Sequence, residues 1–249
     1  MIYAQNTTNN TGVAICGDYN DFNNLYGSLH TVVGNEEEHP ALEQSRLRVL
    51  GLCYDLRHAF MGDREILFVD NGINEDVKRF QSVICSDKNV YMKIKMFWPE
   101  TLFIIMVLNE LLDLHAESLA KKHHIRFTDS KTIWNLPLVT VRQFQAAIMH
   151  CLSETVTAPT FSRMLNIMNS EYLTFRDYLT QYIDLLNYRF VKMSPEKRLK
   201  NISIMAKRIA QRDKDYIDLE DELESAAREQ GYPRESFELQ LELPKKIDW

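Results

Sequence analysis

One segment of the sequence, residues 42–61, carries side chains that could do chemistry within an otherwise apolar stretch. Its apolar residues cover most of the circumference of the helix that their spacing predicts; they are Leu47, Val49, Leu50, Leu52, Cys53, Leu56, Ala59 and Phe60. The polar residues in and just after it are Arg46, Arg48, Asp55, Arg57, His58, Asp63 and Arg64. A helix that is apolar nearly all round is expected to be buried, and buried charges need partners.

Two interpretations fit these charges. In the first they form the polar pocket of a hydrolase or nuclease-like enzyme, in which acid, base and anion-binding groups converge. Its candidate catalytic residues are Asp55, Arg57, His58 and Asp63, and its candidate anion-binding residues are Arg46, Arg48 and Arg64. In the second, an internal ion-pair network, for example Arg48 with Asp55, fixes how the helix docks. We favour the network, and an open cleft that gathers these side chains would favour the enzyme.

A weaker candidate is a metal site near the end of a predicted apolar helix, residues 99–122. Its candidate ligands are His115, Glu117 and His123, because acidic and histidine side chains at such spacings can line one side of a helix. The sequence contains neither H-E-x-x-H nor the cysteine pair of a zinc deaminase, and it also lacks G-x-S-x-G, Walker and G-x-G-x-x-G motifs. We therefore favour a solvated helix end and expect no metal and no other cofactor.

The charges of the C-terminal half fall into two blocks. Residues 195–214 carry a net charge of +5 and residues 215–229 a net charge of −6. The basic block could contact nucleic acid through Lys197, Lys200, Lys207, Arg208 and Arg212. Because the two blocks nearly cancel, and the whole chain has a net charge of −6, we favour pairing within the fold and disfavour nucleic acid as a partner.

Hydrophobic periodicity predicts an α+β fold with a small mixed or antiparallel sheet and packed helices. Strands are expected at residues 2–5, 13–16, 66–69 and 90–97, and the run 66–69 is apolar on both faces, which is typical of an interior strand. From about residue 139 to Gly231 the pattern is helical, as in a helical bundle. Residues 237–243 alternate with period 2, and their acidic face complements Lys93 and Lys95, so we expect a C-terminal strand that returns to the sheet. The expected organisation is an α+β domain over 1–130, a helical region over 131–232 and this strand within 233–249.

Composition points to a cytoplasmic protein. The four cysteines, Cys16, Cys53, Cys85 and Cys151, have no zinc-site spacing and have apolar neighbours, so we expect buried free thiols in a reducing compartment. The longest apolar run, residues 102–108, is far shorter than the roughly 20 residues that a bilayer span needs. The first residues also lack the pattern of a signal peptide, and no membrane partner is expected.

Two stretches resemble a known family. They are residues 12–22, GVAICGDYNDF, and residues 45–65, SRLRVLGLCYDLRHAFMGDRE. Both are similar to uncharacterised proteins of Gram-positive bacteria, and the resemblance extends over roughly residues 1–100. It implies a bacterial cytosolic setting and no particular activity.

The function that these features favour is a protein-interaction or regulatory module without catalytic activity. A protein partner is expected, and the tyrosine-rich segment 172–186 is a candidate contact for a homodimer. The Asp/Arg/His enzyme and the basic nucleic-acid-binding helix are the alternatives.

Overall fold

A four-stranded antiparallel sheet forms the centre of the fold in this computed structural model, which describes residues 1–82, 84–126 and 128–249. Its strands are β1 (Tyr3–Asn6), β2 (Gly12–Gly17), β3 (Glu65–Asp70) and β4 (Lys88–Phe97), in the order β1-β2-β4-β3. The Asn/Thr-rich turn joins β1 to β2 as a hairpin, with Thr7 N donating to the Gly12 carbonyl at 2.9 Å. The predicted α+β class is confirmed.

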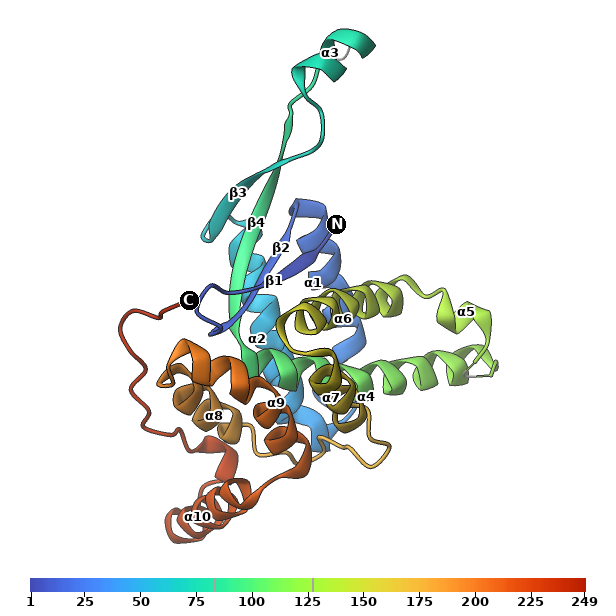
Figure 1. Cartoon of the computed structure of the whole chain (residues 1–249). Coiled ribbons are helices and arrows are strands. Elements are labelled where there is room, and N and C mark those ends of the chain that lie inside the picture. The colour runs from blue at the N-terminus through green and yellow to red at the C-terminus, as the bar shows by residue number, and fades with distance from the viewer. Residues whose placement is uncertain (83, 127) are drawn as a thin grey trace.

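The longest strand, β4, is shared between two partners. Residues 92–97 pair with β2, and residues 88–93 pair with β3. The sheet is therefore staggered, and β3, α3 (Glu75–Gln81) and the first part of β4 project away from the other elements (Figure 1). We call residues 65–91 the arm.

The prediction that residues 66–69 form an interior strand was wrong. β3 is an edge strand whose only partner in the sheet is β4, and Ile66 and Phe68 are 50% and 68% exposed. A short apolar run is equally compatible with burial on both faces and with an exposed binding surface. Sequence periodicity does not separate the two.

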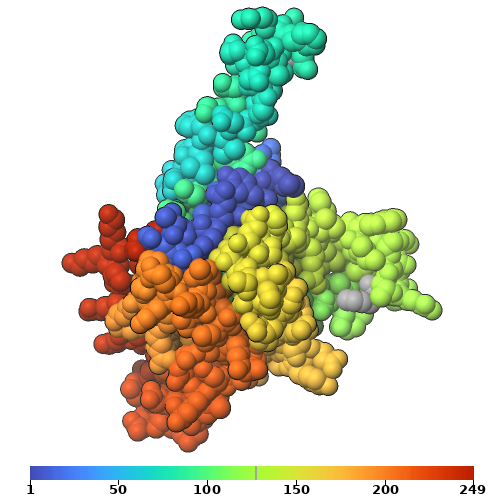
Figure 2. All heavy atoms as spheres, viewed as in Figure 1, coloured from blue at the N-terminus to red at the C-terminus, as the bar shows by residue number. Residues whose placement is uncertain are grey.

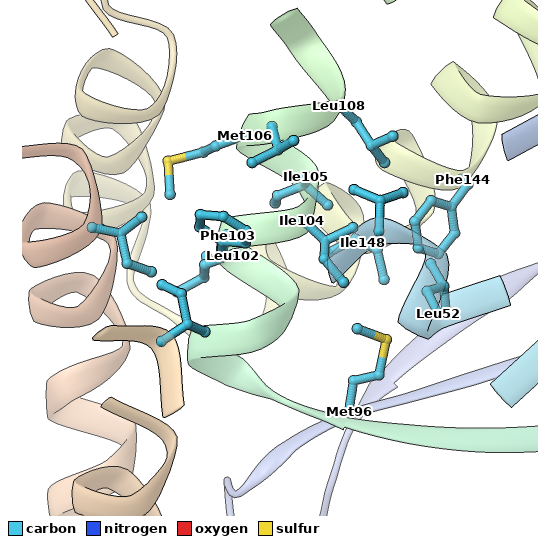
Figure 3. Close-up of a cluster of buried hydrophobic side chains, with 14 of the residues drawn as sticks. Leu52, Met96, Leu102, Phe103, Ile104, Ile105, Met106, Leu108, Phe144 and Ile148 are labelled. Carbon is cyan, nitrogen blue, oxygen red and sulfur yellow. The ribbon is translucent and has the colours of Figure 1, made fainter. Parts of the chain in front are cut away.

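Helices cover the inner part of the sheet. α1 (Tyr19–Val33), α2 (Glu43–Phe60), α4 (Trp98–His123) and α6 (Leu136–Thr155) surround a continuous apolar core. α4 follows β4 without a loop, since Pro99 in its first turn is compatible with a helix start. In Figure 3, Leu52 of α2, Met96 of β4 and Phe144 of α6 gather around the apolar first half of α4.

The remaining helices lie beside this core and share it. They are α5 (Ser130–Ile133), α7 (Ala158–Met168), α8 (Gln181–Val191), α9 (Pro195–Gln211) and α10 (Lys214–Gln230), with the 3₁₀ turns η1 (Pro40–Leu42) and η2 (Arg234–Ser236). The aromatic rings of Tyr178, Tyr182 and Tyr216 are buried against one another, whereas Tyr172 of the tyrosine-rich segment 172–186 is exposed. Within the described residues, none of the helices has both the length and the apolar character to cross a bilayer.

The predicted C-terminal strand does not form. Residues 237–249, all of them described, follow an extended path without strand pairing, although the side chains of Phe237, Leu239 and Leu241 are half-buried. The sequence predicts that Lys93 and Lys95 pair with the acidic side chains of this segment. Both lysines pair with Glu65 of β3 instead. The chain end still returns to the sheet, where the Trp249 ring stacks on Phe97 with a centroid separation of 5.1 Å (Figure 1).

The cysteines differ in their surroundings. Cys16, Cys53 and Cys151 are buried free thiols, whereas Cys85 lies exposed in the arm, so the prediction of burial was wrong for Cys85. Burial raises the pKa of Cys53 to about 12 and that of Cys151 to about 11. These two thiols are therefore protonated and shielded at neutral pH.

We expect one thiol to react quickly with Ellman's reagent in the native protein and all four to react after denaturation. The reactive species is the thiolate, and only Cys85 is accessible among the four. Absorbance at neutral pH measures the stoichiometry of each phase. The variant Cys85→Ser should lose the fast phase, and a second fast thiol in that variant would contradict the burial of the others.

Candidate functional site

The charged helix α2 is joined to two other helices through Arg48. Its Nε and Nη2 atoms donate to the two carboxylate oxygens of Glu100 in α4, at 2.7 and 2.6 Å, and Nη2 also lies 2.6 Å from Asp184 Oδ1 in α8. Asn187 Nδ2 donates to Glu100 as well, at 2.8 Å. We call this set of four side chains the Arg48 clamp.

Arg48 is a permanently charged structural group. Burial acts to lower its pKa, but hydrogen bonds and charges from Glu100 and Asp184 outweigh burial and raise the pKa above the usual arginine range. The predicted pairing of Arg48 with Asp55 was wrong, although the prediction of an ion-pair network was right in kind. No local sequence signal marks the true partners, because they lie 52 and 136 residues away.

The second arginine of the helix holds a neighbouring loop. Arg46 is 5% exposed, donates to both oxygens of Glu43 at 2.8 and 2.9 Å, and donates to the Gly34 carbonyl at 3.3 Å. Its guanidinium is thus occupied by the chain itself. This leaves little capacity for the anion that was predicted to bind there.

The remaining candidates pair locally around the end of α2. Asp55 Oδ1 accepts from Arg64 at 2.7 Å, and His58 Nδ1 lies 2.9 Å from Asp63 Oδ2. Arg57 is exposed. These contacts fix the turn from α2 into β3, at the base of the arm.

The candidate catalytic residues do not converge. Arg48 and Asp55 line a cavity of about 510 Å³ together with Lys95, Glu100 and Trp249. Arg57, His58, Asp63 and Arg64 are not among its lining residues. His58 and Asp63 therefore lie outside this cavity, and most charged side chains of α2 pair with one another or with neighbouring elements, as in an ion-pair network.

The weak metal candidates are also dispersed. Among the described residues, no cluster of three or more His, Cys, Asp and Glu side chains has a geometry that could hold a metal ion. His115 is half-buried, its Nε2 has no partner among those residues, and burial lowers its pKa. His115, Glu117 and His123 thus do not form such a cluster.

The basic segment 197–214 divides into inward and outward side chains. Arg208 lies 3.0 Å from Asp215, and Arg212 donates to the carbonyls of Thr174 and Arg176 at 3.2 Å. The Arg208 contact joins the basic block to the acidic block, and the Arg212 contacts tie the basic block to the loop before α8. The exposed basic side chains of α9 are Lys197, Lys200 and Lys207.

The arm carries an apolar surface that sequence reasoning missed. Phe68 lies opposite Val90, and Ile66 lies opposite Met92, so all four side chains share one face of the sheet. Met92 is 7% exposed because helices cover this face, but Val90, two residues farther out, is 55% exposed. Near the tip, Phe80 and Ile84 are almost fully exposed. We call Ile66, Phe68, Phe80, Ile84 and Val90 the arm surface.

A family model matches residues 2–249, and its description is a domain of unknown function (DUF6904). Comparison with curated proteins and with solved structures found no match. The predicted resemblance to a family stopped near residue 100, and this extent was wrong because the match includes the helical half and the C-terminal tail. The chain therefore belongs to this family of domains of unknown function.

Proposed function

We propose that the chain is a protein-interaction module of the bacterial cytosol, and that the arm surface binds an amphipathic helix of a partner protein. One observation carries the proposal. The sheet face that helices cover in the body continues onto the arm, where nothing in the described residues covers it.

The covered part of that face indicates what the uncovered part would bind. Ile94 and Met96 of β4 are buried in the apolar core, and Figure 3 shows Met96 beneath the first half of α4. Ile66, Phe68 and Val90 continue the same row of apolar side chains beyond the last covering helix. An amphipathic helix presents a matching apolar stripe, and exposed apolar patches of this kind are typical of protein interaction sites.

Ion pairs at both ends of the β3–β4 pairing stabilise the arm, while one of its faces is apolar. A two-stranded hairpin is marginally stable in water, so its register needs support. Lys88 lies 3.1 Å from Asp70 at the outer end of the pairing, and Lys93 pairs with Glu65 at the inner end. Figure 2 shows the arm as a narrow projection that stands clear of the body.

The two alternatives have less support. Asp55, His58 and Asp63 are each paired with a neighbouring side chain around the end of α2, and Arg57 is exposed. In the basic segment, Arg208 and Arg212 are engaged internally. Neither arrangement offers the convergent groups that catalysis or nucleic-acid recognition requires.

A site-specific photocrosslinking experiment tests this function. A benzoylphenylalanine residue at position 68 is expected to crosslink a partner protein in cells, and mass spectrometry should place the adduct in an amphipathic helix. The same probe at Tyr172, which is 86% exposed but lies outside the arm, is the matched control and should give no such adduct.

Binding of the purified partner to the purified chain then decides the outcome. The double variant Ile66→Thr/Phe68→Thr keeps strand-forming residues and should weaken binding at least tenfold, or about 1.4 kcal/mol, because it removes exposed apolar contacts. Tyr172→Thr should bind as the wild type does. Equal crosslinking at both positions, an adduct within a second copy of the chain, or unchanged affinity of the double variant would contradict the proposal.

A further inference from the structure

A cavity between α8 and the C-terminal tail has a composition that the proposed function does not use. Its volume is about 540 Å³, within the range of small-molecule sites. We infer that it binds an aliphatic cation, that is, an alkyl ammonium or guanidinium group, carried by a free amine or by a lysine or arginine side chain. This inference is independent of the arm.

One wall of the cavity is a polar stripe of α8. Gln181, Asp184 and Asn187 follow one another at intervals of three residues and therefore lie on one side of the helix. Glu100 of the Arg48 clamp lies behind them, with its carboxylate 2.8 Å from Asn187 Nδ2. The stripe is made of acceptor groups.

The charge of the lining is negative. Its ionisable carboxylates are Glu100, Asp184, Glu235 and Glu238, and no lysine, arginine or histidine is among the lining residues. Arg48 neutralises part of this charge through Glu100 and Asp184, and Arg234 lies 3.0 Å from Glu235. Four carboxylates thus face two neighbouring cations, so a further positive charge would be attracted.

Two buried amide oxygens in the lining have no hydrogen-bond donor. Gln181 and Asn187 are 7% and 6% exposed, and neither Gln181 Oε1 nor Asn187 Oδ1 has a partner among the described residues. Their nitrogens fix the orientation, because Gln181 Nε2 donates to the carbonyls of Arg234 and Phe237 and Asn187 Nδ2 donates to Glu100. Buried acceptors are normally satisfied, so these two are suited to N–H groups of a ligand.

The tail adds apolar side chains to the lining, beside Glu235 and Glu238. Leu239, Leu241 and Leu243 of the tail alternate toward the cavity, and Phe97 adjoins them. The cavity therefore combines acidic and partly exposed apolar side chains. Positions where a sequence departs from the usual pattern of a fold often belong to binding sites. An aliphatic stem against the leucines, with its cationic head at Asp184 and Asn187, would contact both kinds of side chain.

The aromatic edge of the cavity already attracts an ammonium group. Lys192 Nζ lies 3.9 Å from the centroid of the Tyr188 ring, and Tyr188 is a lining residue. A metal ion is a poorer candidate, since the described residues contain no group of three donors in a metal-binding arrangement. The chemistry of the lining therefore favours an organic cation.

Isothermal titration calorimetry of the full chain tests this inference with two probes. n-Butylamine represents a free amine, and acetyl-arginine amide represents an arginine side chain of a peptide; the probe that binds more tightly identifies the source. N-butylacetamide, which has a stem but no charge, should not bind. Saturable binding of at least one cation is expected at or below about 10 mM, together with weakening by salt.

Variants locate the binding site. Asp184→Asn should weaken binding at least tenfold, and Glu238→Gln, in the exposed tail where folding is not at stake, should weaken it about threefold. Glu222→Gln removes the same charge from an exposed position of α10 outside the lining and should bind as the wild type does. No saturable binding, equal binding of N-butylacetamide, or equal affinities of the Glu238→Gln and wild-type proteins would overturn the inference.

Discussion

Replacement of Arg48 by methionine is expected to lower the free energy of unfolding by roughly 3–5 kcal/mol. Methionine keeps the aliphatic stem but removes the guanidinium that contacts Glu100 and Asp184. The Glu100 side chain is 17% exposed, so its carboxylate would remain largely shielded from water with Asn187 as its remaining donor. The loss arises mainly from this uncompensated charge.

Urea unfolding followed by circular dichroism measures the effect. Arg57→Met is the matched control, because Arg57 lies on the same helix but is exposed, and its cost should stay within about 0.5 kcal/mol. In a double-mutant cycle with Glu100→Gln, the coupling energy should exceed about 1 kcal/mol, since the two side chains form one network. Equal stability of Arg48→Met and Arg57→Met would show that the clamp is not a structural element.

The Arg48 clamp could be predicted from the sequence only in part. The apolar circumference of α2 correctly predicted that its charges need partners inside the fold. The partner proposed from the sequence, Asp55, lies on the same helix, whereas the true partners come from α4 and α8. Periodicity describes one helix at a time, and the neighbours of a side chain depend on how several helices pack.

β3 and the C-terminal tail show the same limit in the sheet. Period-2 alternation predicted a strand in the tail, and a short apolar run predicted an interior position for β3. In the structure β3 pairs with β4. Glu65 of β3 forms the ion pairs with Lys93 and Lys95 that were predicted for the tail. Local pattern alone gives both segments strand character, but it does not predict which of them pairs with β4.

The basic segment gives a third case, in which the net charge was counted correctly but the position of one of its cations was not predicted. Within the net charge of +5, Arg198 is 4% exposed. It donates to Val191 O at 2.7 Å, Thr11 Oγ1 at 2.8 Å and Asn9 O at 3.1 Å. A residue that looks like part of a basic surface therefore joins α9 to the β1–β2 turn.

Arg198→Met is accordingly expected to lower the free energy of unfolding by about 3 kcal/mol, because three acceptors lose a charged donor and two of these contacts are buried. Thermal and urea unfolding measure the change. Lys200→Met, an exposed position two residues along α9, is the control and should cost less than about 0.5 kcal/mol.

The role of the chain end can be separated from that of Arg198. Asp248 Oδ2 lies 3.7 Å from Arg198, but the Asp248 side chain is 63% exposed, so Asp248→Asn should cost no more than about 1 kcal/mol. A large loss in Asp248→Asn with a small loss in Arg198→Met would mean that the tail, and not the arginine, ties the β1–β2 turn to α9. If Arg198→Met instead left stability unchanged and weakened binding of duplex DNA at low salt, Arg198 would belong to a nucleic-acid surface and its burial against the turn would be wrong.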